Sequence, residues 1–175
     1  MKSEKTGLEW FNSCSEAGAL EQFRKCCGSS LWTERMAHHR PFTSLQELKR
    51  VADETYNGLT AGDWKEAFSH HPKIGDVKSL REKFASTQQW AAGEQSGAHN
   101  ASEQVLSALA EGNTAYHQKF GYIFIVCATG KSAEEMLGLL KERLPNNPDT
   151  ELLIATEEQR KIMHLRLEKL LGDHS

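Results

Sequence analysis

The chain lacks a long hydrophobic run: no stretch of its 175 residues approaches the roughly 20 consecutive apolar residues that a membrane-spanning helix needs. Its first residues, Met1 to Gly7, are polar and lack the apolar core of a signal peptide. Its last residues, Asp173-His174-Ser175, do not form a peroxisomal signal. We therefore expect a cytoplasmic protein that has no membrane as a partner.

The chain also lacks a surplus of basic residues, since 21 lysines and arginines stand against 24 aspartates and glutamates. Domains that bind nucleic acid usually carry a basic surplus, so we expect no nucleic-acid partner. With 38% hydrophobic and 26% charged residues, the composition is typical of a globular protein. We predict a single domain over residues 1–175, with its core in about 8–171.

Cysteine is scarce, and the four thiols are not spaced like metal ligands. They are Cys14, Cys26, Cys27 and Cys127. No Cys-x-x-Cys pair occurs, so neither a zinc ribbon nor a thioredoxin-type motif is supported. Reduced thiols, some of them buried, are the simplest account.

Strand patterns are nearly absent, and helical periodicity runs through most of the sequence, which predicts an all-α fold. The predicted helices are 16–27, 29–38, 45–57, one starting at Thr60-x-x-Asp63, one or two within 86–120, one after Ser132-x-x-Glu135, and 150–171. Only Tyr122–Cys127, which is β-branched and aromatic, favours a strand. A lone strand cannot satisfy its own backbone groups, so we expect a buried extended segment there, or a helix that overrides propensity.

Residues 70–76, His-His-Pro-Lys-Ile-Gly-Asp, form the most informative pattern. Pro72 holds the preceding His71 away from helical backbone, and Gly75 permits a turn that other residues resist. His71 is therefore a candidate general acid or base on a fixed loop, because imidazole titrates near neutral pH. The alternative is an ordinary polar loop between two helices.

Two further sites, Glu94 with Gln95 and Arg166, carry polar side chains that are candidates for ligand binding. On a helix, Glu94 and Gln95 share a face with Ala91 and Ala98, where a flat polar heterocycle would find donors and acceptors; an exposed helix face gives the same pattern. Arg166 projects from the apolar side of its helix. Its guanidinium needs an anionic ligand or a structural salt bridge, because a buried unpaired cation is costly, and the sequence leaves both open.

Together these segments resemble the 2-oxo-4-hydroxy-4-carboxy-5-ureidoimidazoline (OHCU) decarboxylase family of uric acid breakdown. The matching segments, in the family's order, are Arg40–Phe42, His71–Asp76, Glu94–Ser96, Tyr116–Ala128, Glu135 and Lys161–Leu167. Each is weak by itself, but all of them in order are specific and cover nearly the whole chain.

The resemblance implies a compact all-α domain, usually a homodimer, that uses no cofactor and no metal. It implies a carboxy-lyase that converts OHCU to (S)-allantoin, with His71 as the catalytic residue supported by Glu94. Substrate contacts are implied for Pro72, Ala91, Glu94, Gln95, Phe124, Ile125, Val126, Cys127, Ala128 and Arg166.

Ala91 departs from the family pattern, because some members carry a Ser or Thr at this position. A hydroxyl contact to the substrate is then missing or replaced, which leaves a catalytically inactive helical binding module of the same fold as the alternative function. Two other rivals are a metal-dependent hydrolase that uses His38, His39, His70 and His71, and a structural helical protein without a ligand.

Overall fold

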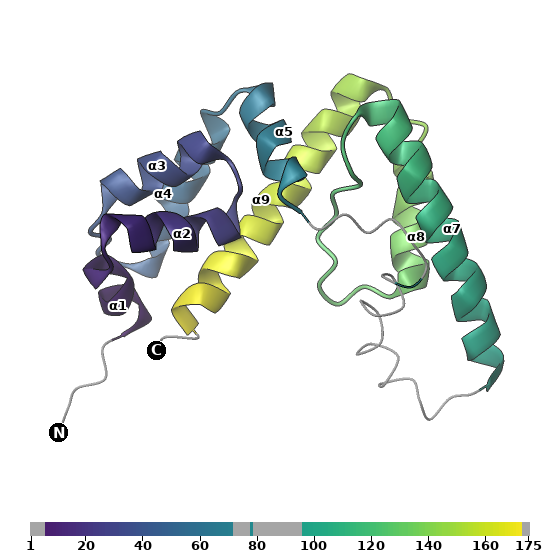
Figure 1. Ribbon diagram of the computed structural model, residues 1–175, viewed down its shortest axis with the longest axis horizontal. Coiled ribbons are helices and arrows are strands. Elements are labelled where there is room, and N and C mark those ends of the chain that lie inside the picture. Colours follow the sequence, from purple (N-terminus) through teal and green to yellow (C-terminus); the bar gives the residue numbers. More distant parts are fainter. Residues whose placement is uncertain (1–5, 72–77, 79–95, 173–175) are drawn as a thin grey trace. The chain divides into compact units, whose positions relative to one another are not determined.

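The computed structural model describes residues 6–71, 78 and 96–172 (Figure 1). The chain divides into two compact units. Unit 1 comprises Met1–His71 and Thr156–Ser175, and unit 2 comprises Pro72–Ala155. In the described ranges every regular element is a helix, so the all-α prediction is confirmed.

Unit 1 contains the first five helices and the later part of a long C-terminal helix. They are α1 (Gly7–Ser13), α2 (Glu16–Cys26), α3 (Ser30–His39), α4 (Leu45–Asn57), α5 (Ala61–Ser69) and α9 (Pro148–Gly172). Each of α1 to α5 begins at a Ser or Thr whose side chain accepts a backbone N–H. These caps satisfy N–H groups that have no partner inside the helix. The helix predicted to start at Thr60-x-x-Asp63 is present, and its first turn forms a capping box.

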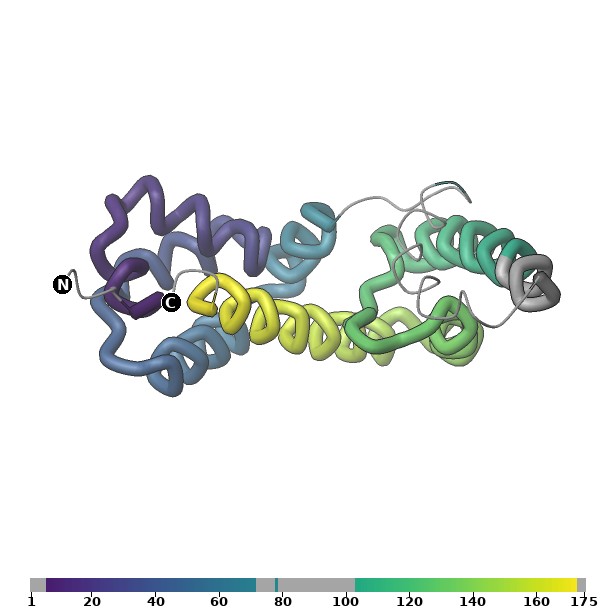
Figure 2. Tube along the Cα trace, turned by 90° about the horizontal axis from the view of Figure 1, so that it is seen from below, coloured from purple at the N-terminus to yellow at the C-terminus, as the bar shows by residue number. Residues whose placement is uncertain are grey.

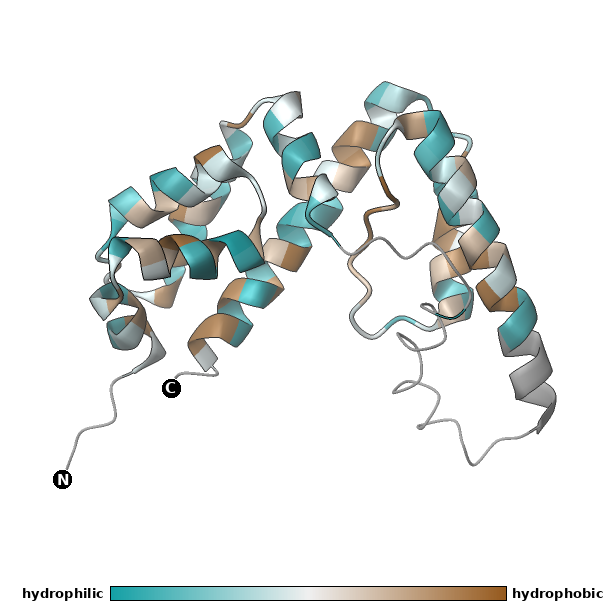
Figure 3. Ribbon diagram, viewed as in Figure 1, coloured by the Kyte–Doolittle hydropathy of each residue, from teal (hydrophilic) through white to brown (hydrophobic). Residues whose placement is uncertain are grey.

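The core of unit 1 lies between these helices and the C-terminal half of α9 (Figure 2). Its largest fully buried side chains include Trp32, Tyr56 and Phe23, and α9 contributes Met163 and Leu167, both fully buried. The Trp32 indole donates to the Ala52 carbonyl over 3.1 Å, so even this polar atom is satisfied inside the core. Hydrophobic and hydrophilic residues alternate along the ribbon of α9 (Figure 3).

Unit 2 contains α7 (Ser96–Phe120), α8 (Ala133–Arg143) and the start of α9. Helices α7 and α8 pack against each other. A Cβ at Gly112 would collide with the side chain of Leu140, so this glycine permits their close approach.

Of the two forms predicted for Tyr122–Cys127, the structure has the non-helical one. Ile125 is 2% exposed, and the segment carries neither helix nor strand. Side chains bind its carbonyl groups in place of a neighbouring strand: Arg143 Nη1 donates to the Ile125 oxygen and Lys131 Nζ to the Cys127 oxygen, each over 2.7 Å. Two of the carbonyl groups that a strand would pair with a neighbouring strand are thus bound by cationic side chains.

Helix α9 begins two residues earlier than predicted, with Pro148 in its first turn, where a missing N–H costs nothing. It runs without a break from unit 2 into unit 1. Over the described part of the chain, none of the helices is both long enough and apolar enough to span a bilayer.

Candidate functional site

His71 lies directly after α5 and is tied to it through its backbone. His70 caps the helix, and the His71 N–H donates to the Phe68 carbonyl over 3.2 Å. The side chain of His70 lies so close to Gly28 that a Cβ there would overlap its ring. The backbone N–H of His71 is therefore bound at the end of α5, and the residue itself is partly buried. Pro72 and Gly75, which are expected from the sequence to fix this loop, lie outside the described residues.

The imidazole of His71 is hydrogen-bonded to Gln159 of α9, with 2.5 Å between Nε2 and Oε1. Gln159 is fully buried. Its amide oxygen is an acceptor only, so the proton in this bond belongs to His71. The amide nitrogen of Gln159 has no hydrogen-bond partner within the described ranges.

Sequence reasoning missed Gln159. It stands between Glu158 and Arg160 and looks like part of a charged helix surface. One signal existed: at a spacing of four residues its neighbours are Ala155 and Met163, both fully buried.

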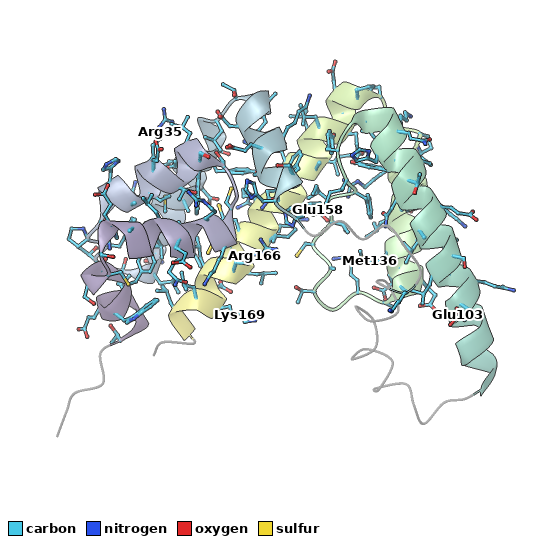
Figure 4. All side chains as sticks on the ribbon, in the orientation of Figure 1. Arg35, Glu103, Met136, Glu158, Arg166 and Lys169 are labelled. Carbon is cyan, nitrogen blue, oxygen red and sulfur yellow. The ribbon has the colours of Figure 1, made fainter. Side chains whose placement is uncertain are left out.

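Arg166 stands on α9 seven residues after Gln159 (Figure 4). Seven residues are nearly two turns, so the two side chains leave almost the same face, about 10 Å apart along the helix axis. The Nη1 of Arg166 donates to the carbonyl of Lys25 over 3.1 Å, at the C-terminal end of α2. A cation is favourable at that end of a helix, where carbonyls lack partners.

The alternative of a structural salt bridge at Arg166 finds no support in the described residues, where no carboxylate lies within ion-pair distance of it. Its charge does act on two neighbouring thiols. Burial raises the pKa of Cys26 to about 12 and that of Cys27 to about 11, and the guanidinium of Arg166 partly opposes both shifts.

Four of the predicted site residues lie outside the described residues: Pro72, Ala91, Glu94 and Gln95. Their roles stay predictions. What the structure brings together in unit 1 is His71 with Gln159, and Arg166 on the same face of α9.

The predicted binding segment Phe124–Ala128 belongs to unit 2, where Ile125, Val126 and Cys127 are buried. The guanidinium of Arg143 lies 4.5 Å from the centre of the Phe124 ring and donates to the Ile125 carbonyl. The backbone of this segment is therefore held by a side chain of α8.

Arg143 is in turn held by Glu151, which is fully buried. Arg143 Nε donates to Glu151 Oε1 over 2.7 Å, and Asn146 donates to Oε2 over 3.1 Å. The Tyr116 hydroxyl donates to Oε1 over 2.5 Å. Burial and this bond to the carboxylate raise the pKa of Tyr116 well above its usual range, so its proton stays in place at any working pH.

The four histidines of the metal-hydrolase hypothesis are all described. Across the described residues, no group of three or more His, Cys, Asp or Glu side chains is arranged to hold a metal ion. His38 is exposed and faces Glu16 over 3.5 Å, whereas His39 stacks on the Phe42 ring.

An open hollow along α7 is not the predicted site. Its lining consists of Glu103, Gln104, Ser107, Ala108 and Glu111, all from one helix. None of them was predicted to bind a ligand.

Comparison with known proteins decides the family. The model of the OHCU decarboxylase family matches residues 12–168. The chain belongs to the OHCU decarboxylase family. This match extends over both units and confirms the resemblance seen in the sequence.

The chain is 42% identical over 156 residues to the uric acid degradation bifunctional protein TTL of Arabidopsis thaliana, covering 87% of this chain but only 47% of that protein. The chain thus spans about half the length of this relative. It is 27% identical over 132 residues to the 2-oxo-4-hydroxy-4-carboxy-5-ureidoimidazoline decarboxylase of Amia calva, covering 75% of each.

A solved structure of an OHCU decarboxylase, obtained in the presence of (S)-allantoin, matches the fold with a TM-score of 0.69. It is 40% identical and covers 87% of this chain and 99% of that chain. The helical fold of the family is therefore the fold of this chain.

Proposed function

We propose that this chain is a carboxy-lyase that decarboxylates OHCU to (S)-allantoin in uric acid breakdown, without a cofactor. The observation that carries the proposal is the fixed imidazole of His71, anchored through its backbone to α5 and through Nε2 to Gln159, in a chain of this family. The names of the relatives and the (S)-allantoin of the similar structure support it.

The substrate supplies its own electron sink, since the carbon that loses CO₂ is next to a conjugated ring. When that C–C bond breaks, its electron pair passes into the ring, and the ring takes up one proton for the CO₂ that leaves. The protein must hold the carboxylate out of the ring plane, stabilise the developing charge with preorganised donors, and deliver the proton to one face. Delivery to one face sets the S configuration.

His71 is the proposed acid and base, because a neutral imidazole can both accept and return a proton near pH 7. Glu94 is proposed to raise the pKa of His71 and to support it. Pro72, Ala91 and Gln95 are proposed to contact the substrate.

Two described features support the remaining contacts. The segment Phe124–Ala128 is proposed to anchor ring and ureido groups through its backbone, and the bond from Arg143 to the Ile125 carbonyl supports a preorganised backbone there. Arg166 is proposed to bind an oxygen-rich, partly anionic end of the substrate. Its guanidinium donates to a neutral carbonyl, so its charge remains available to an anion.

The remaining assignments are part of the same proposal: one domain over residues 1–175, a homodimer, and the cytoplasm. The unbroken helix α9 and the family match across both units support one domain. The dimer rests on the family resemblance, and light scattering of the purified protein tests it. Microscopy of a tagged chain tests the location.

The deciding experiment is circular dichroism on urate degraded by urate oxidase and hydroxyisourate hydrolase, with and without this protein. We expect rapid growth of an optically active allantoin signal, and its loss with His71→Asn. Slow racemic decay that the wild-type protein does not change would refute the proposal. It would favour the inactive binding module, for which Ala91 is the one feature in the sequence.

A further inference from the structure

Gln159 is the residue that orients the proposed catalytic imidazole. We propose that Gln159 is a positioning residue that holds His71 as the Nε2–H tautomer, so that Nδ1 is the nitrogen that exchanges protons with the substrate. The proton on Nε2 follows from the hydrogen bond to Gln159, whereas its catalytic consequence rests on the proposed function.

The chemistry of the bond requires this assignment. A neutral imidazole carries one N–H and one lone pair, and the amide oxygen at 2.5 Å from Nε2 can only accept. The lone pair is therefore on Nδ1. When Nδ1 takes up a proton, the same amide oxygen accepts a charge-assisted hydrogen bond from Nε2–H and stabilises the imidazolium.

The protein keeps the Gln159 amide in place by burial. Gln159 is fully buried on α9, and Met163, one turn later, is also fully buried. A side chain that is enclosed in this way loses its other rotamers, so it orients its partner with no further entropic cost when the substrate binds.

A second histidine of the same helix provides the contrast. His164 Nε2 lies 2.7 Å from Asp53 Oδ1, so its partner is a carboxylate. A carboxylate adds a full negative charge and favours the charged imidazole, whereas an amide selects a tautomer without that charge. At Nε2 of His71 the acceptor is an amide oxygen, which favours a proton on that nitrogen without adding a full negative charge.

The test is ¹⁵N NMR of the full chain labelled at histidine, in which ring nitrogens with and without a proton have well-separated shifts. We expect His71, assigned by its absence in His71→Asn, to show a protonated Nε2 and an unprotonated Nδ1. Gln159→Met, which removes the acceptor at similar volume, is expected to produce a mixture of tautomers. It should lower kcat by about 10–100-fold with little change in KM, by analogy with the cost of losing a hydrogen-bond partner that orients a metal-bound histidine.

Gln159→Glu keeps an acceptor but adds a negative charge, so it is expected to keep the proton on Nε2 and to raise the pH at which Nδ1 loses its proton. Gln118→Met, the same change at an exposed position of α7, is the control and should alter neither spectrum nor rate. The signals of His164 report on the fold of α9 in every variant.

A neutral His71 that carries its proton on Nδ1 in the wild-type protein would overturn the inference, as would a Gln159→Met variant with unchanged tautomer and kcat. If Gln159→Met does not fold, the spectra of the wild type and of Gln159→Glu still show which ring nitrogen of His71 carries the proton. A wild-type protein that shows the Nε2–H tautomer but does not decarboxylate OHCU would refute the proposed function and leave the tautomer standing.

Discussion

Arg143 and Glu151 form an ion pair that is almost completely buried, with Arg143 7% exposed and Glu151 not exposed at all. The same guanidinium donates to the carbonyl of Ile125, so the pair connects α8 and α9 to the segment that follows α7. Buried charges of this kind are stable only when their remaining hydrogen bonds are made, and Tyr116 and Asn146 complete them here.

Replacing Arg143 with Met is expected to destabilise the protein by about 3–5 kcal/mol, because Glu151 would then be a buried charge without its partner. Urea unfolding followed by circular dichroism measures this difference. The double variant Arg143→Met/Glu151→Leu should recover part of the loss, since no uncompensated charge remains.

Arg50→Met is the matched control, because Arg50 pairs with Glu54 on the exposed side of α4. Its cost should stay within about 1 kcal/mol, as is usual for a surface pair. Equal effects of Arg143→Met and Arg50→Met would show that the buried pair does not hold unit 2 together.

His71→Asn is expected to lower kcat for OHCU by about 10²–10⁴ with a smaller effect on KM, the usual range for loss of a general acid or base. Steady-state kinetics on freshly generated substrate measures it. His38→Asn, at an exposed histidine of α3, should leave both constants unchanged. A near-native rate of His71→Asn would remove His71 from the chemistry.

Helices α2 to α5 were predictable because their start signals are local, whereas α1 was not predicted. Ser44 and Thr60 each bind a backbone N–H three residues away, and such contacts need no knowledge of the rest of the fold. The expected ends of α2 to α5 therefore agree with the structure to within a residue or so.

For the segment Tyr122–Cys127, burial was predictable from the sequence but the backbone conformation was not. Its residue types indicated burial, but its conformation depends on Arg143, which is 18 residues from Ile125 in the chain. The contact between Gln159 and His71 was harder still to predict, because the two residues are 88 positions apart and no local pattern indicates that they meet. Sequence patterns predict elements and faces, whereas pairs of distant side chains are set by packing.

Arg166→Lys is expected to lower kcat/KM by roughly 10–100-fold, the loss that matches one hydrogen bond to a charged group. A lysine retains the charge but not the planar fork, so it cannot bind the Lys25 carbonyl and an anionic substrate group together. Kinetics at constant ionic strength measures the change.

Arg160→Lys is the control, because Arg160 stands on the same helix and pairs with Glu157 and Asp53. It should leave kcat/KM within about twofold of the wild type, in keeping with the small effects of surface charges. Unchanged kcat/KM for Arg166→Lys would refute the role of Arg166 in substrate binding.

The adjacent thiols Cys26 and Cys27 should make the protein sensitive to alkaline pH. Burial raises their pKa values from 9.0 to about 12 and about 11, so above pH 9 the unfolded thiols ionise while the folded ones keep their protons. The unfolded state then binds fewer protons than the folded state, and stability falls as pH rises from about 9 towards 11 and 12. At pH 10 the loss is roughly 1.4 kcal/mol for each thiol.

The double variant Cys26→Ala/Cys27→Ala isolates this contribution from that of other groups. It should be less stable than the wild type at pH 7, because two buried side chains are truncated, but its unfolding free energy should fall less between pH 8 and pH 10. Urea unfolding at the two pH values measures this decrease for the wild type and for the double variant. An equal decrease of the unfolding free energy in both proteins would mean that the two thiols ionise as readily in the folded protein as in the unfolded chain. That result would contradict the effect of burial on their pKa values.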